Sequence, residues 1–64
     1  MNRLETALQR FEELEDDTLL IRYLRNHSSD EILDDADALN IDVSYEDVMG
    51  LSAYALADLI IDQI

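Results

Sequence analysis

Apolar residues recur at every third or fourth position along most of the chain, which is the spacing of one face of a helix. No stretch alternates strictly between apolar and polar residues, as a half-buried strand would. The first series follows Asn2, a residue that can cap a helix, and predicts a helix over residues 3–15. Its apolar positions are Leu4, Leu8, Phe11 and Leu14.

A second apolar cluster begins after Asp16 and is rotated relative to the first. The change of angle favours a break and a second helix over residues 17–26. A single helix over residues 4–26 stays open as an alternative, because no Gly or Pro forces the break. The apolar residues of this cluster are Leu19, Leu20, Ile21, Tyr23 and Leu24.

A third helix is predicted over residues 29–39. Ser28 and Glu31 have the spacing of a capping box, in which a serine caps the helix and a glutamate lies three residues later. Asn40 suits the left-handed residue that often ends a helix. The inner face of this helix would hold Ile32, Leu33, Ala36 and Leu39.

The last predicted helix covers residues 45–63, starts after the candidate cap Ser44, and is apolar around most of its circumference. A helix of this kind must be surrounded, either by the other helices or by a second chain. Its candidate core or oligomer-contact residues are Val48, Met49, Ala53, Leu56, Ile60 and Ile64. We therefore expect one all-α domain over residues 1–64, a compact bundle of three or four short helices completed by a dimer or a partner.

Composition restricts what such a bundle can do. The chain has 64 residues, 16 acidic residues, four arginines, no lysine and no cysteine, for a net charge of −12. The absence of cysteine rules out disulfides and thiolate metal sites. Direct binding to nucleic acid or to an anionic membrane requires a basic face, so both are excluded. No secretory leader is visible, and we expect a cytoplasmic protein.

The charge is divided unevenly between the two halves of the chain. Residues 1–25 carry all four arginines and a net charge of −2, whereas residues 26–64 carry ten acidic residues, no arginine or lysine, and a net charge of −10. Acids three or four residues apart form rows on one side of a helix. The candidate partner-binding residues are therefore Asp30, Glu31, Asp34, Asp35, Asp37, Asp42, Glu46 and Asp47.

An acidic helical surface can occupy a groove that normally binds nucleic acid, because the groove's cations supply the missing counter-charge. In composition, the chain resembles the small acidic decoys that phages and mobile elements make against restriction, CRISPR or recombination enzymes. The resemblance implies a non-enzymatic inhibitor but assigns no residues. At the contact, Tyr45 or Tyr54 is a candidate aromatic anchor, and Tyr54 as a core residue stays open as an alternative. Two other interpretations stay open: a solvated face or adaptation to high salt, and an assembly module that oligomerises or docks through the last helix.

Two further chemistries are considered and not favoured. Asp35, Asp37 and Glu46 match positions 1, 3 and 12 of a calcium loop, but the helix signal through Leu39 contradicts a loop. Residues 27–30 contain a histidine, two serines and an aspartate, yet a catalytic triad needs these groups brought together in space. We therefore predict no enzyme activity, no metal site and no cofactor, with His27 as an exposed linker residue.

Overall fold

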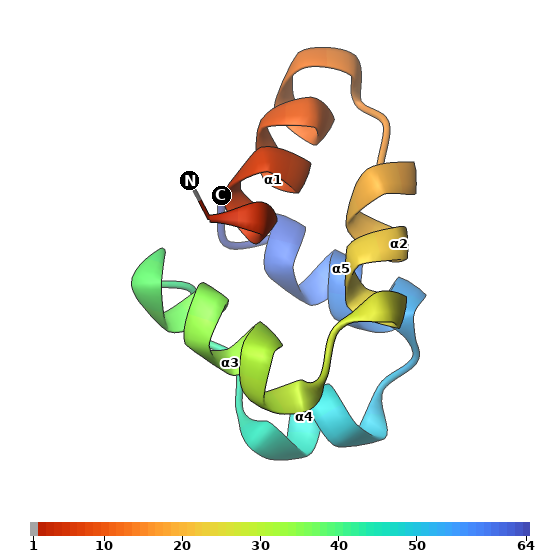
Figure 1. Ribbon diagram of the computed structural model, residues 1–64. Coiled ribbons are helices and arrows are strands. Elements are labelled where there is room, and N and C mark those ends of the chain that lie inside the picture. Colours follow the sequence, from red (N-terminus) through yellow and green to blue (C-terminus); the bar gives the residue numbers. More distant parts are fainter. Residues whose placement is uncertain (1) are drawn as a thin grey trace.

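The computed structural model describes residues 2–64, and within this part of the chain it contains five α-helices and no strand (Figure 1). The all-helical class is therefore confirmed, with five helices in place of the expected three or four. Their bounds are Arg3–Leu14 for α1, Thr18–Asn26 for α2, Ser29–Ala38 for α3, Tyr45–Gly50 for α4 and Ala53–Ile61 for α5.

The chain breaks between α1 and α2, so the alternative of one long helix is wrong. The Asn2 side chain caps α1 by accepting hydrogen bonds from the backbone N–H groups of Leu4 (2.8 Å) and Glu5 (3.3 Å). At the other end Glu15 adopts a left-handed conformation with φ of 52°. A left-handed residue stops the helical hydrogen-bond series and turns the chain. The turn lets α2 run back along α1 (Figure 1).

The third helix begins at the predicted residue and ends at Ala38, one residue earlier than predicted. Ser28 accepts a hydrogen bond from the backbone N–H of Glu31 (3.3 Å), and Asn40 is left-handed with φ of 58°. The chain then turns Ile41 into the core, where it is buried. The connection after α3 is held by the Gln63 amide, which bonds both the N–H (2.7 Å) and the carbonyl (2.8 Å) of Asp42.

The single helix predicted over residues 45–63 is wrong. It is interrupted at Leu51, whose backbone is extended (φ −92°, ψ 151°), and the chain resumes as α5. The physical reason is local. Gly50 has a low helix propensity, and Ser52 offers an N-cap, accepting a hydrogen bond from the backbone N–H of Ala55 (3.2 Å). The break turns α4 away from the direction of α5 (Figure 1).

The core lies where α1, α2 and α5 meet. Its largest fully buried side chains are Leu4, Leu20 and Ile60, one from each of these helices. α5 lies behind α1 and α2, while α3 and α4 pack against each other at the lower end (Figure 1). Of the residues predicted as core or oligomer contacts, Leu56 and Ile60 are buried, Val48 and Ala53 are half-buried, and Met49 and Ile64 are exposed. Within residues 2–64, no helix combines the length and apolarity needed to cross a bilayer.

Candidate functional site

The predicted acidic residues lie on α3, on the segment after it, and on α4. Ionised side chains are seldom buried without a partner, and most of these carboxylates are exposed. Six of the eight are exposed, namely Asp30, Glu31, Asp34, Asp37, Asp42 and Glu46, and we call these six residues the acidic surface. The remaining two, Asp35 and Asp47, are half-buried.

Three members of the acidic surface line one shallow groove of about 510 Å³ between α3 and the segment that follows it. Asp34 and Asp37 face this groove from α3, and Asp42 faces it from the chain beyond the helix. The left-handed turn at Asn40 places Asp42 there. The groove therefore presents three carboxylates in a concave, accessible arrangement.

Asp35 has a structural role that differs from its predicted place in the binding face. Its carboxylate accepts a hydrogen bond from the phenol of Tyr23, and its backbone carbonyl accepts one from the Asn2 side chain (3.0 Å). Burial of the Tyr23 phenol, followed by its bond to Asp35, raises the pKa of Tyr23 above the usual tyrosine range. These contacts hold α1, α2 and α3 together.

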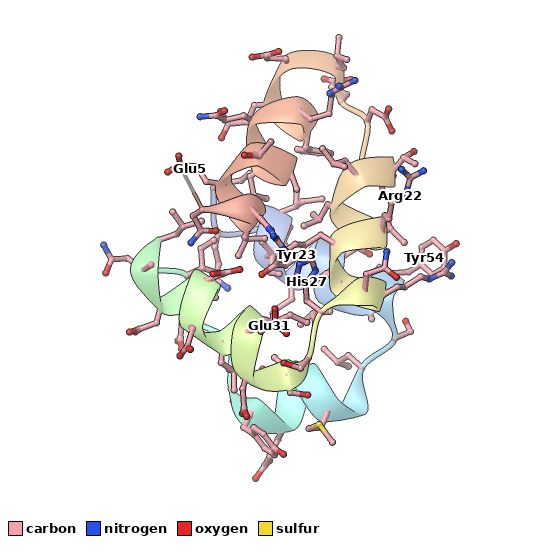
Figure 2. The ribbon with its side chains drawn as sticks, viewed as in Figure 1. Glu5, Arg22, Tyr23, His27, Glu31 and Tyr54 are labelled. Atoms are coloured by element: carbon pink, nitrogen blue, oxygen red, sulfur yellow. The ribbon has the colours of Figure 1, made fainter. Side chains whose placement is uncertain are left out.

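His27 is half-buried and has several partners, so the expectation of an exposed linker residue is wrong. Its Nδ1 lies 2.8 Å from the Tyr23 carbonyl, and its Nε2 lies 3.2 Å from an Arg3 nitrogen. Since Arg3 can only donate, Nε2 accepts and Nδ1–H donates to the carbonyl. The imidazole also stacks on the Tyr23 ring, with centroids 4.3 Å apart (Figure 2).

A weak signal for this arrangement is present in the sequence, because His27 follows Tyr23 by one helical turn. Ser28, the neighbouring hydroxyl, is engaged as the cap of α3. Both ring nitrogens of His27 and the serine hydroxyl are thus committed to contacts that hold the helices in place. Sequence reasoning missed these contacts because they depend on how α1 and α3 pack around the end of α2.

The arginines lie on α1 and α2, and Arg3 lines one groove together with Glu31 and Asp34 of the acidic surface. Arg25 lies over the ring of Tyr54 at 5.3 Å, and it donates a long hydrogen bond (3.4 Å) to the Tyr54 hydroxyl. The side chains of Arg22 on α2 and Tyr54 on α5 both point outward beside α2 (Figure 2), and with Arg25 they line a groove of about 430 Å³. None of the residues that line this groove belongs to the acidic surface, whereas Arg3 lies beside that surface.

The calcium-loop alternative is contradicted by the structure. Asp35 and Asp37 lie within α3 and cannot wrap around an ion as loop residues would. Across residues 2–64, no three histidine or acidic side chains gather in a way that could hold a metal ion. No protein-family model, no curated protein and no solved structure matches this chain.

Proposed function

We propose that this protein is a non-enzymatic inhibitor or regulator whose acidic surface imitates nucleic acid and occupies the basic groove of a nucleic-acid-binding protein. The observation that carries the proposal is the exposure of six carboxylates over α3, the segment after it and α4, in a half of the chain that carries no arginine or lysine. Residues 26–64 hold no arginine or lysine, so we expect a partner protein to supply the positive charge that these carboxylates attract.

The physical basis is the similarity of charge density. Duplex DNA carries roughly one negative charge per 1.7 Å of its axis, and its protein partners present Lys and Arg to that density. Carboxylates on successive turns of α3 offer a comparable row of anions on a rigid helix. The net charge of −12 attracts a basic protein from a distance and raises the association rate at low salt.

The groove lined by Asp34, Asp37 and Asp42 is the part of the acidic surface best placed for bidentate contact with arginine. Two of its carboxylates come from one helix and the third from the following segment, and all three line the same groove. Arginine guanidinium groups pair with carboxylates through two parallel hydrogen bonds, which adds orientation to attraction.

The experiment that tests the proposal uses the immobilised protein to capture partners from a cell lysate, followed by elution in a salt gradient. The captured protein is then challenged with duplex DNA. We expect release at moderate salt and competition by DNA, because both ligands occupy one basic groove. A partner that resists 1 M salt, or that binds DNA and this protein together, contradicts the proposal.

A matched pair of variants locates the contact. The variant Asp34→Asn, Asp37→Asn, Asp42→Asn removes three charges from the groove, and we expect it to weaken binding at least tenfold. The control Glu12→Gln, Glu13→Gln, Asp17→Asn also removes three exposed charges, but from α1 and the turn before α2. Equal losses in the two variants would mean that only total charge matters.

A second candidate function, an assembly module, is favoured by the exposed apolar side chains of the C-terminal part. Met49 and Tyr54 are 59% and 60% exposed, and Ile64 is 52% exposed. Sedimentation at rising salt separates the two candidates. Assembly through apolar contacts strengthens as charge repulsion is screened, whereas capture of a basic partner weakens.

A further inference from the structure

The short helix α4 adds no buried side chain to the core and exposes most of its apolar ones. Tyr45 is 56% exposed, Met49 is 59% exposed, and Leu51, just after the helix, is 41% exposed. Single exposed apolar residues are common and need no explanation. Here Tyr45 and Met49 are four residues apart and therefore share one face of the helix, with Leu51 immediately beyond it. We call these three side chains the α4 patch.

The α4 patch is held against the start of α3. The Ser29 hydroxyl lies 2.8 Å from the Met49 sulfur, which places the thioether beside the first turn of α3. That turn carries Asp30 and Glu31, and the first turn of α4 carries Glu46 and Asp47. Glu46 adjoins Tyr45 in the chain, and Asp30 adjoins Ser29, which contacts Met49, so acidic residues from two helices border the α4 patch.

This border decides which occupant fits the α4 patch. A second copy of the chain would bring another net charge of −12 and the same acidic border, so like charges would oppose the contact. An anionic bilayer is repelled for the same reason. A partner segment with an apolar side chain flanked by lysines or arginines fits better. Its apolar side chain would pack on the α4 patch, and its cationic side chains would pair with the acidic residues around it.

We infer that the α4 patch is the apolar anchor of the partner contact and that it binds a basic amphipathic segment of the partner. The inference rests on the proposed function and adds to it the chemistry of the partner's surface. Methionine adapts its shape to an apolar partner, and the tyrosine ring accepts a cation on its face. Contacts of this kind, desolvated at the centre of an interface, carry most of the binding energy, while the charges at the rim set rate and orientation.

The test uses the whole protein and two synthetic 18-residue peptides of equal positive charge. The first is an amphipathic helix of lysine and leucine with the leucines on one face. The second carries serine at every leucine position. We expect the amphipathic peptide to bind at least tenfold more tightly in calorimetry at 0.15 M salt. The variant Tyr45→Ser, Met49→Ser should abolish this difference, and circular dichroism should show its helix content unchanged.

The control variant is Leu14→Ser, which changes a side chain equally exposed at 60% but located at the end of α1. It should keep the full preference for the amphipathic peptide. Equal binding of the two peptides, with steep salt dependence, overturns this inference and leaves the proposed function standing. Binding of neither peptide overturns both. A loss of preference in Leu14→Ser as large as that in Tyr45→Ser, Met49→Ser also overturns the inference.

Discussion

The phenol of Tyr23 donates a hydrogen bond to the carboxylate of Asp35, and this bond joins α2 to α3 across twelve residues of sequence. Tyr23 is 5% exposed and Asp35 is half-buried, so the bond is partly buried. Asp35 also receives the Asn2 side chain on its backbone carbonyl. Asp35 thus fixes the start of α1 and the middle of α2 relative to α3, the helix that carries much of the acidic surface.

Tyr23→Phe should lower the free energy of unfolding by about 1–3 kcal/mol, because it removes a bond to a charged group and leaves the Asp35 carboxylate partly buried without its donor. Urea unfolding followed by circular dichroism measures the change. Tyr45→Phe is the control, because that phenol is exposed. A loss in Tyr23→Phe no larger than in the control would show that the bond contributes nothing to stability.

The raised pKa of Tyr23 predicts how the fold responds to alkali. Its first cause is burial, and its second is the hydrogen bond to Asp35. The folded state favours the neutral phenol. The contribution of Tyr23 to the free energy of unfolding is therefore fully present below the ordinary tyrosine pKa of about 10. Above that pH the unfolded chain ionises first, and stability falls by up to about 1.4 kcal/mol per pH unit. Tyr23→Phe should lose less stability between pH 10 and pH 11, and parallel curves would contradict this account.

The turn between α1 and α2 offers a prediction at low pH. Hydrogen bonds from the Thr18 hydroxyl and backbone N–H lower the pKa of Asp16, and Arg10 adds a smaller attraction. A lowered pKa in the folded state means that this contribution is present above the ordinary aspartate pKa and is lost as the pH falls through the lower value. Carboxyl chemical shifts followed by NMR should show the Asp16 midpoint rising in Thr18→Ala. An unchanged midpoint would remove Thr18 as the cause.

The break between α4 and α5 depends on the cap at Ser52. Ser52→Ala should cost about 1 kcal/mol of stability, because the backbone N–H of Ala55 loses its acceptor. Gly50→Ala is the contrasting change. A methyl group there has no heavy atom within 4 Å, so we expect a gain of roughly 0.4–1 kcal/mol from the reduced freedom of the unfolded chain. Thermal unfolding measures both, and stabilisation by Ser52→Ala would mean that one continuous helix is preferred.

The starts of α3 and α4 could be predicted because capping acts over three residues. Ser28 and Ser44 each accept a backbone hydrogen bond from the residue three positions later. The break at Leu51 could not be predicted from apolar spacing, since that pattern continues through it. The relevant residues are Gly50 and Ser52. Each lowers the stability of a continuous helix only slightly, but together with the packing of α5 on α2 they produce the break.

For the candidate site, exposure of the acidic residues follows from their charge and could be predicted one residue at a time. Their grouping could not. Asp42 joins Asp34 and Asp37 only because the chain reverses at Asn40. The sequence places Asp35 in the binding face, yet its carboxylate accepts a hydrogen bond from the phenol of Tyr23 on α2. Such differences depend on contacts between distant parts of the chain, which periodicity does not encode.

Ile60 is fully buried, and it comes from the last helix to be synthesised among those described. Its neighbours in the core, Leu4 and Leu20, belong to the first two helices. During translation α1 and α2 therefore leave the ribosome with one side of their shared apolar surface uncovered until α5 follows. Because a small domain folds as a unit, the chain should gain its native packing only after residue 60 has emerged. Until then the nascent chain exposes apolar surface, and its net negative charge opposes association between neighbouring copies.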